Sequence, residues 1–146
     1  MSGNRIFRGS IAEQPKTISK PVTGALLPGT FVTIGASALA QATTPAGRVG
    51  ILGGRNFYNQ DNTTAYTSGE TGIAYRVEPD LEFQVAVAAG TYTFGQELTI
   101  GASGRLVAAA STNVVVAFFD DASKAGVAQS AGALCDVVIA NSYTKA

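Results

Sequence analysis

The spacing of three acidic residues is the pattern in this 146-residue chain that comes nearest to acid–base chemistry. Glu78, Asp80 and Glu82 alternate, and alternate residues of a straight strand share one face. Pro79 interrupts such a strand, and the Glu-Pro-Asp string is typical of a turn between two strands. Carboxylate pairs also serve glycoside hydrolysis, but that reaction needs a fixed separation that sequence spacing does not supply. We therefore expect a turn here.

Asp120 and Asp121 form the second acidic pair. They follow the apolar string Val-Ala-Phe-Phe at residues 116–119, so we expect them to end a strand. Their oxygens could instead join a calcium site with further ligands, which is the lesser alternative. Cys135 lies in an apolar run, where we expect an inert, partly buried thiol, and one cysteine cannot form a disulfide within the chain.

Nucleophilic catalysis finds no support in the residue types. The chain has no histidine, which excludes Ser-His-Asp and Cys-His mechanisms and removes the commonest metal ligand. Ser19-Lys20 and Ser123-Lys124 put the two members of a Ser-Lys pair side by side in sequence, and turn composition accounts for both. We predict a protein that is not an enzyme and that needs no cofactor or metal.

Composition also bounds the partners. Ten basic residues balance ten acidic ones, so the chain as a whole does not complement a phosphate backbone, and we expect no nucleic-acid binding. The longest apolar runs, such as residues 114–119, are far shorter than the roughly 20 residues that span a bilayer. The glycine-rich segment 47–54 lacks the Lys-Ser/Thr of a phosphate-binding loop. No apolar signal segment follows the first basic residues, so we expect no secretion and no membrane partner.

An internal repeat organises the chain. Residues 24–37 recur as residues 90–103, with Gly24, Gly29 and the whole Thr-Ile-Gly-Ala-Ser string kept. After one inserted residue, Gly104, the match continues along the chain, so that the copies span residues 24–54 and 90–121. A collinear match of this length indicates duplication, although the composition is rich in Ala, Gly and Thr. Gly104 can take a positive φ at no steric cost, which makes the second hairpin the better specified one.

The fold class follows from the periodicity. Helical spacing is nearly absent, and short β-branched or aromatic runs are separated by turn residues. We predict an all-β fold, a small β-barrel or sandwich built from two related β-hairpin units, with one turn of helix as an option at residues 121–125. The expected strands are residues 30–34, 48–52, 73–78, 81–88, 97–100, 106–109, 114–119 and 134–140.

Two segments lie outside the repeat. Residues 1–23 contain two prolines and an excess of basic residues, and we expect an extended N-terminal arm preceding a single β domain at residues 24–146. Residues 53–72 form a polar loop with three aromatic residues. Such residues pack on the body or on another subunit. The candidate contact residues with a partner or a sister subunit are Arg5, Ile6, Phe7, Arg8, Ile11, Lys16, Lys20, Phe57, Tyr58 and Tyr66.

The second copy of the repeat resembles a known family. Residues 94–122 carry a Gly-Ala-Ser-Gly-Arg-Leu turn, then alanines, then a Val-rich strand that ends in Asp-Asp-Ala. This pattern resembles the head-decoration or capsid-cement proteins of tailed bacteriophages, and residues 24–54 carry a weaker copy. The resemblance implies a β-rich structural virion protein, often a homotrimer, that binds the major capsid protein on the exterior of the shell and stabilises it. It also implies synthesis in the host cytoplasm, and it brings no catalytic residues.

Two other functions remain open at this point. A carbohydrate-binding or adhesive module would use Phe57, Tyr58 and Tyr66 as stacking faces, although the chain has no tryptophan. Another phage structural subunit, such as a tail-tube or fibre component, would polymerise. Sugar binding and polymerisation are the observations that separate these functions from shell binding.

Overall fold

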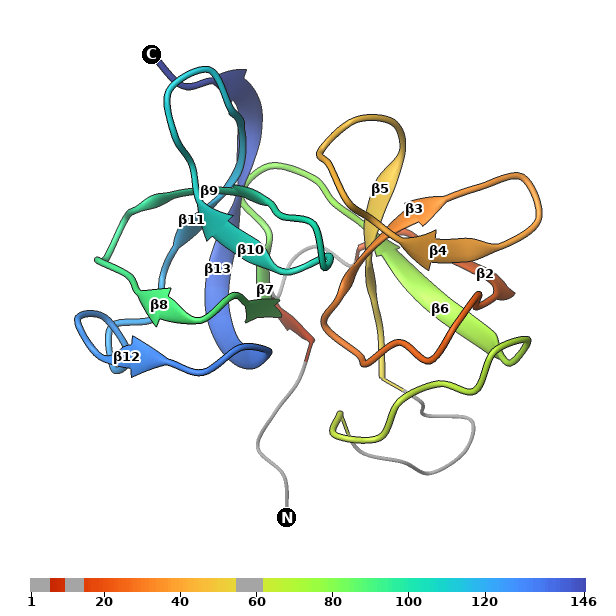
Figure 1. The fold of residues 1–146 in the computed structure, drawn as a ribbon. Helices are drawn as coiled ribbons and strands as arrows, with labels where there is room; N and C mark the ends of the chain where they lie inside the picture. Colours follow the sequence, from red (N-terminus) through yellow and green to blue (C-terminus); the bar gives the residue numbers. More distant parts are fainter. Residues whose placement is uncertain (1–5, 10–14, 55–61) are drawn as a thin grey trace.

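The computed structural model describes residues 6–9, 15–54 and 62–146, and these residues are all-β, without a helix (Figure 1). This confirms the predicted all-β class, and strands β9 and β11 have the predicted bounds. The strands are β1 (Phe7–Gly9), β2 (Thr17–Pro21), β3 (Phe31–Ile34), β4 (Leu39–Gln41), β5 (Val49–Leu52), β6 (Thr71–Arg76), β7 (Glu82–Val87), β8 (Gly90–Thr91), β9 (Glu97–Ile100), β10 (Leu106–Ala108), β11 (Val114–Phe119), β12 (Ala128–Gln129) and β13 (Ala133–Thr144).

The strands form three sheets. The first has five strands in the order β2-β6-β5-β3-β4, and the second has six in the order β1-β7-β10-β9-β11-β13. The second sheet closes on itself, because β7 also pairs with β13. A small third sheet joins β12 to β8. We call β2 to β6 the first unit and β7 to β13 the second unit; they lie on the right and the left of Figure 1.

The two copies of the repeat pair their strands in the same register. In the first unit β3 lies between β4 and β5, with Val32 opposite Gln41 and Gly50. In the second unit β9 lies between β10 and β11, and Leu98, the counterpart of Val32, lies opposite Ala108 and Ala117. The hydrogen bonds of the turns match as well: the N–H groups of Gly29 and Gly95 donate to the carbonyls at the ends of β5 and β11.

The correspondence extends beyond the segments that match in sequence. Ile18 of β2 lies opposite Ala74 of β6, and Phe83 of β7 lies opposite Val137 of β13. Ala74 and Val137 in turn lie opposite the last residues of β5 and β11. Each unit also has an equivalent parallel contact: Val22, just beyond β2, bridges Leu39 of β4, and Val87 of β7 pairs with Leu106 of β10. The two units therefore share one strand topology: the first is a curled sheet whose two ends meet at an isolated bridge, and the second is closed by the pairing of β7 with β13.

The interior positions of the two units correspond but differ in size. The first unit has its own core cluster, to which Ile18, Val22, Leu26, Val32, Ile34, Leu39, Leu52 and Ala74 contribute. The residues at the same positions of the second unit are Phe83, Val87, Tyr92, Leu98, Ile100, Leu106, Phe119 and Val137. Most of these are larger. In the first unit, the ring of buried Tyr66 fills the interior space beside Gly72. The Tyr66 hydroxyl donates to the Gly53 carbonyl at 2.8 Å.

The units meet through close backbone contacts. The Phe31 N–H of the first unit donates to the Gly104 carbonyl at 2.9 Å, and the Ala86 N–H of the second unit donates to the Gly29 carbonyl at 3.0 Å. Gly104 has a φ of +69°, and a Cβ there would lie 2.8 Å from the Phe31 carbonyl oxygen. The residue inserted in the second copy of the repeat therefore allows the β9–β10 hairpin to approach the first unit.

The N-terminal segment differs from the expected arm. Among residues 1–23, β1 pairs with β7, β2 pairs with β6, and Ile6 and Val22 are buried. These parts are bonded into the sheets because β2 supplies the first strand of one unit and β1 covers an edge of the other. Residues 78–80 form the predicted turn, in which the Leu81 N–H donates to the Glu78 carbonyl. Residues 122–126 are turn, in which the Ala125 N–H donates to the Asp121 carbonyl at 2.9 Å as in one turn of helix, and no longer helix forms there.

Replacing Gly104 tests the close approach of the units. Gly104→Ala adds a Cβ in contact with backbone and imposes a left-handed conformation, so we expect a loss of at least about 2 kcal/mol in the free energy of unfolding. Gly47 also has a positive φ but has open space around it, so Gly47→Ala should cost only about 1 kcal/mol. Denaturant unfolding measures both. Equal losses for the two variants would contradict a tight junction.

Candidate functional site

Three of the predicted contact residues lie on or beside β1 and serve the fold. Ile6 is buried in the larger core cluster, and its carbonyl accepts from the Gln84 N–H. The Phe7 ring packs against the rings of Tyr75 and Phe83, at centroid distances of 6.3 and 5.4 Å. Arg8 is exposed and forms an ion pair with Asp136 on β13. The apolar side chains of Ile6 and Phe7 are thus covered mainly by this chain's own residues.

The other predicted contact residues are scattered. Lys16 is exposed, and Lys20 donates its Nζ to the Ala36 carbonyl at 2.6 Å. Tyr66 is only 2% exposed, so its ring offers no stacking face for a sugar. Arg5, Ile11, Phe57 and Tyr58 lie outside the described residues. The predicted residues that the structure describes do not form one exposed patch, because Ile6 and Tyr66 are buried.

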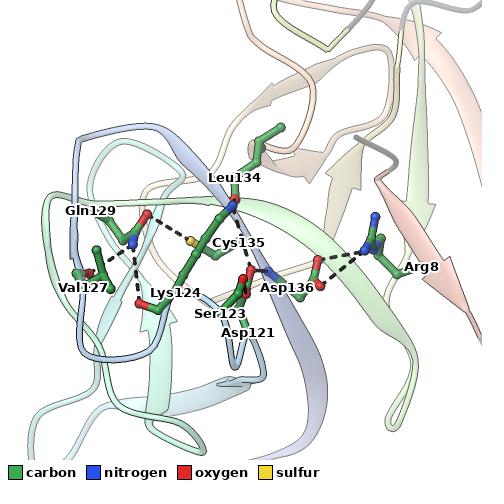
Figure 2. A network of polar contacts seen from close by, with 9 residues as sticks. All are labelled: Arg8, Asp121, Ser123, Lys124, Val127, Gln129, Leu134, Cys135 and Asp136. Atoms are coloured by element: carbon green, nitrogen blue, oxygen red, sulfur yellow. Dashed lines mark hydrogen bonds and ion pairs between the residues drawn. The ribbon is translucent and has the colours of Figure 1, made fainter. Parts of the chain in front are cut away.

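A polar network holds the loop between β11 and β13 in place (Figure 2). Asp121 is buried; one carboxylate oxygen accepts from the Ser123 hydroxyl at 2.8 Å, and the other accepts from the Asp136 N–H at 3.1 Å. Lys124 donates to the Leu134 carbonyl and lies 3.9 Å from Asp121. Hydrogen bonds to the buried Asp121 carboxylate therefore hold this loop in position.

The network ends on an exposed apolar residue. The Gln129 side chain donates to the Val127 carbonyl at 3.0 Å, and the Gly126 N–H donates to the Tyr92 carbonyl at 2.8 Å. These bonds fix the backbone on both sides of Val127, whose residue surface is 54% exposed. A valine held outward on a hydrogen-bonded loop loses little entropy on binding, which suits it to contact another surface.

A surface hollow adjoins this loop. It has a volume of about 350 Å³ and is lined by Leu27 of the first unit and by Lys124, Gly132 and Leu134 of the second, together with Asn62 and Thr63. Leu27 is 39% exposed. Leu27 and Lys124 line this hollow, and Val127 follows Lys124 on the same loop. We call these three residues the Val127 surface.

The charges near β1 are unevenly balanced. Burial raises the pKa of Asp136, the Asp121 and Asp120 charges raise it further, and Arg8 opposes both. Burial and the charges of Asp120 and Asp136 likewise raise the pKa of Glu82. Burial also acts to raise the pKa of Asp121, but its hydrogen bonds with Asp136 and Ser123 and the Lys124 charge outweigh it and lower the pKa. Arg8 thus partly offsets an excess of carboxylates.

The candidate chemical groups are used structurally. Ser123 and Lys124 bond to Asp121 and Leu134 rather than to each other. Burial raises the pKa of the Cys135 thiol to about 11, which fits the predicted inert thiol. In the described ranges, no group of three or more Cys, Asp or Glu side chains could hold a metal ion, which gives the calcium alternative at Asp120 and Asp121 no support.

The chain matches no known family model, and no curated protein sequence matches it. None of the described residues forms a helix of the length and hydropathy needed to cross a membrane.

Sequence reasoning missed the residues that the fold exposes. The large apolar side chains that stand out from the described surface are Leu27, Phe94, Val127 and Tyr143. Their local sequences resemble those of buried strands and turns, so composition alone gives no signal. Phe94 and Leu27 could have been noticed through the repeat, because their counterparts, Pro28 and Thr93, are not large apolar residues.

Substitutions of Glu82 and Arg8 should change stability in opposite directions. The folded state raises the pKa of Glu82, so ionised Glu82 opposes folding at neutral pH, and this effect disappears as pH falls below the ordinary carboxyl range near about 4. Glu82→Gln should raise the free energy of unfolding at pH 7 by about 0.5 kcal/mol, and Arg8→Gln should lower it by a similar amount. Both differences should vanish near about pH 3. Chemical unfolding at the two pH values measures them, and shifts of the same sign would contradict this account.

Cys135 should resist modification while the protein is folded. The thiol is buried and stays protonated at neutral pH, so an aromatic disulfide reagent should react with it only as the chain unfolds. The labelling rate should rise steeply through the denaturant transition measured by circular dichroism. Rapid labelling of the native protein would contradict a closed second unit.

Proposed function

We propose that this protein is a capsid-decoration protein, which binds the exterior of a bacteriophage shell and stabilises it without catalysis. In this proposal the chain is a tandem of two small β-barrels, and its partners are the major capsid protein and sister copies in a homotrimer. The resemblance of residues 94–122 to decoration proteins motivates the proposal. The observation that carries it is exposed Val127, held on a loop by a buried hydrogen-bond network that also positions Lys124 beside the hollow.

The physical argument is one of preorganisation. A decoration protein must bind a preformed shell through contacts that are small individually and repeated many times. Rigid β units with fixed loops lose little conformational entropy on binding, so a small apolar patch can contribute measurable affinity. The described polar groups around the loop bond to each other, which favours a structural role over a reaction.

Substitution of Val127 tests the proposal on undecorated phage heads. Val127→Asp places a charge on the exposed patch and should weaken saturable co-sedimentation with the heads at least about tenfold, because an apolar contact is replaced by a buried charge. Leu27→Asp should act in the same direction. The decorated heads should also survive to higher temperature than bare heads when scanned by calorimetry.

The matched control is Thr43→Asp, on an exposed loop of the first unit. It should bind the heads like the original chain. Absence of saturable binding by the original chain to any tested head would overturn the proposal, and tubes or fibres in negative stain would favour a tail or fibre subunit instead. Deletion of residues 1–20 is a poor test because it removes β1 and most of β2.

A further inference from the structure

The two units of one chain pack head to tail. The first unit contributes the Gly29 turn and the Phe31 region, whereas the second contributes the outer edge of β7 and the tip of the β9–β10 hairpin. Two different surfaces of equivalent units meet in this junction. The first unit therefore still has an unused counterpart of the surface that the second unit contributes, and the second unit has an unused counterpart of the surface that the first contributes. A contact of this kind repeats until it closes into a ring or extends.

The first unit keeps the unused edge. The outward N–H groups of β7 are covered in the second unit, Gln84 by the Ile6 carbonyl and Ala86 by the Gly29 carbonyl. Ser19 is the counterpart of Gln84 on β2. The Lys16 carbonyl accepts from the Arg76 N–H, and the Val22 N–H donates to the Glu70 carbonyl, so the even-numbered residues of β2 bond toward β6. Because backbone groups alternate in direction along a strand, the N–H of Ser19 points away from β6. On that side β2 is the edge strand of its sheet in the described part of the chain.

The second unit keeps the unused face. The counterparts of Pro28, Gly29, Phe31 and Ile51 are Phe94, Gly95, Glu97 and Phe118. The extra length of β13 adds Tyr143, whose ring is tilted against that of Phe118 at a centroid distance of 6.3 Å and whose hydroxyl donates to Glu97. We call these residues the Phe94 face. Phe94 is 61% exposed and Tyr143 is 40% exposed, whereas Phe31 and Ile51 are buried against the second unit.

The charged residues near the edge and the face are already used within the chain. Glu97, the counterpart of Phe31, forms an ion pair with Lys145 at 3.4 Å and accepts from the Tyr143 hydroxyl. Lys20 shares the strand face of Ile18, and its Nζ donates to the Ala36 carbonyl. The groups that remain for a contact are the outward backbone of β2 on the edge and the exposed rings of Phe94 and Tyr143 on the face.

We propose that the Phe94 face binds the open β2 edge of a second copy of this chain, in the head-to-tail arrangement that joins the two units within one chain. The contact is looser than the internal one, because Pro21 replaces Ala86 and has no N–H to donate to the carbonyl of the counterpart glycine. This proposal does not depend on shell binding, since it concerns the purified protein alone.

A mixing experiment with two variants tests the direction of the contact. Phe94→Asp places a charge on the Phe94 face and does not change the β2 edge. Ser19→Pro removes the outward N–H of the β2 edge and does not change the Phe94 face. An edge strand tolerates this proline. The original chain should gain mass with concentration by sedimentation equilibrium. Each variant alone should associate at least about tenfold more weakly. An equimolar mixture should form a one-to-one dimer that grows no further, because one intact junction remains.

The controls separate the contact from the fold and from shell binding. Thermal unfolding verifies that all variants fold, and sedimentation of the purified protein without phage heads keeps shell binding out of the measurement. Phe94→Ser and Thr17→Pro repeat the test with independent substitutions. A monomeric original chain at millimolar concentration, variants that associate normally, or a mixture that stays monomeric would each overturn the proposal. The last result would indicate a symmetric contact or another protein on this face.

Discussion

Satisfaction of the β7 backbone is the constraint on which the arrangement of the molecule depends. One edge of β7 pairs with β13. The other edge is shared, because Ile6 beside β1, the Gly29 turn of the first unit and β10 all bond to it. A buried strand cannot leave donors unpaired at low cost. Covering this one edge therefore brings the N-terminal residues, the first unit and the closing strand of the second unit to the same place.

Divergence between the two units follows from their positions in the chain. The second unit has larger interior residues, a closed edge and a long β13, whereas the first has Gly72 and Ala74 inside and needs the ring of Tyr66 to fill its interior. The first unit also ends in an edge strand that carries Pro21, which limits strand pairing with unrelated chains. The two units thus share one strand topology but differ in their interior side chains and in the residues of their edge strands.

The polar residues reinforce this framework. Asp121 holds the loop that carries Val127, and Arg8 ties β1 to β13 beside Glu82 and Asp136, whose pKa values are raised first by burial and then by neighbouring carboxylates. Such groups would suggest a reactive site if they lined a polar cleft, but here they bond to backbone and to each other. The large apolar side chains exposed on the described surface lie apart from these carboxylates in the sequence, on loops and near the end of β13.

The sequence by itself determined the all-β class, the repeat, the turn at residues 78–80 and the inert thiol, because alternation, turn residues and local burial are written in neighbouring residues. Only the tertiary structure decided that residues near the N-terminus are strands, that Tyr66 fills a core, and that Phe94 and Val127 are exposed. These outcomes depend on contacts between residues far apart in the chain. Whether an aromatic or aliphatic side chain is buried is set by which edge or face another segment covers, and no local pattern records that.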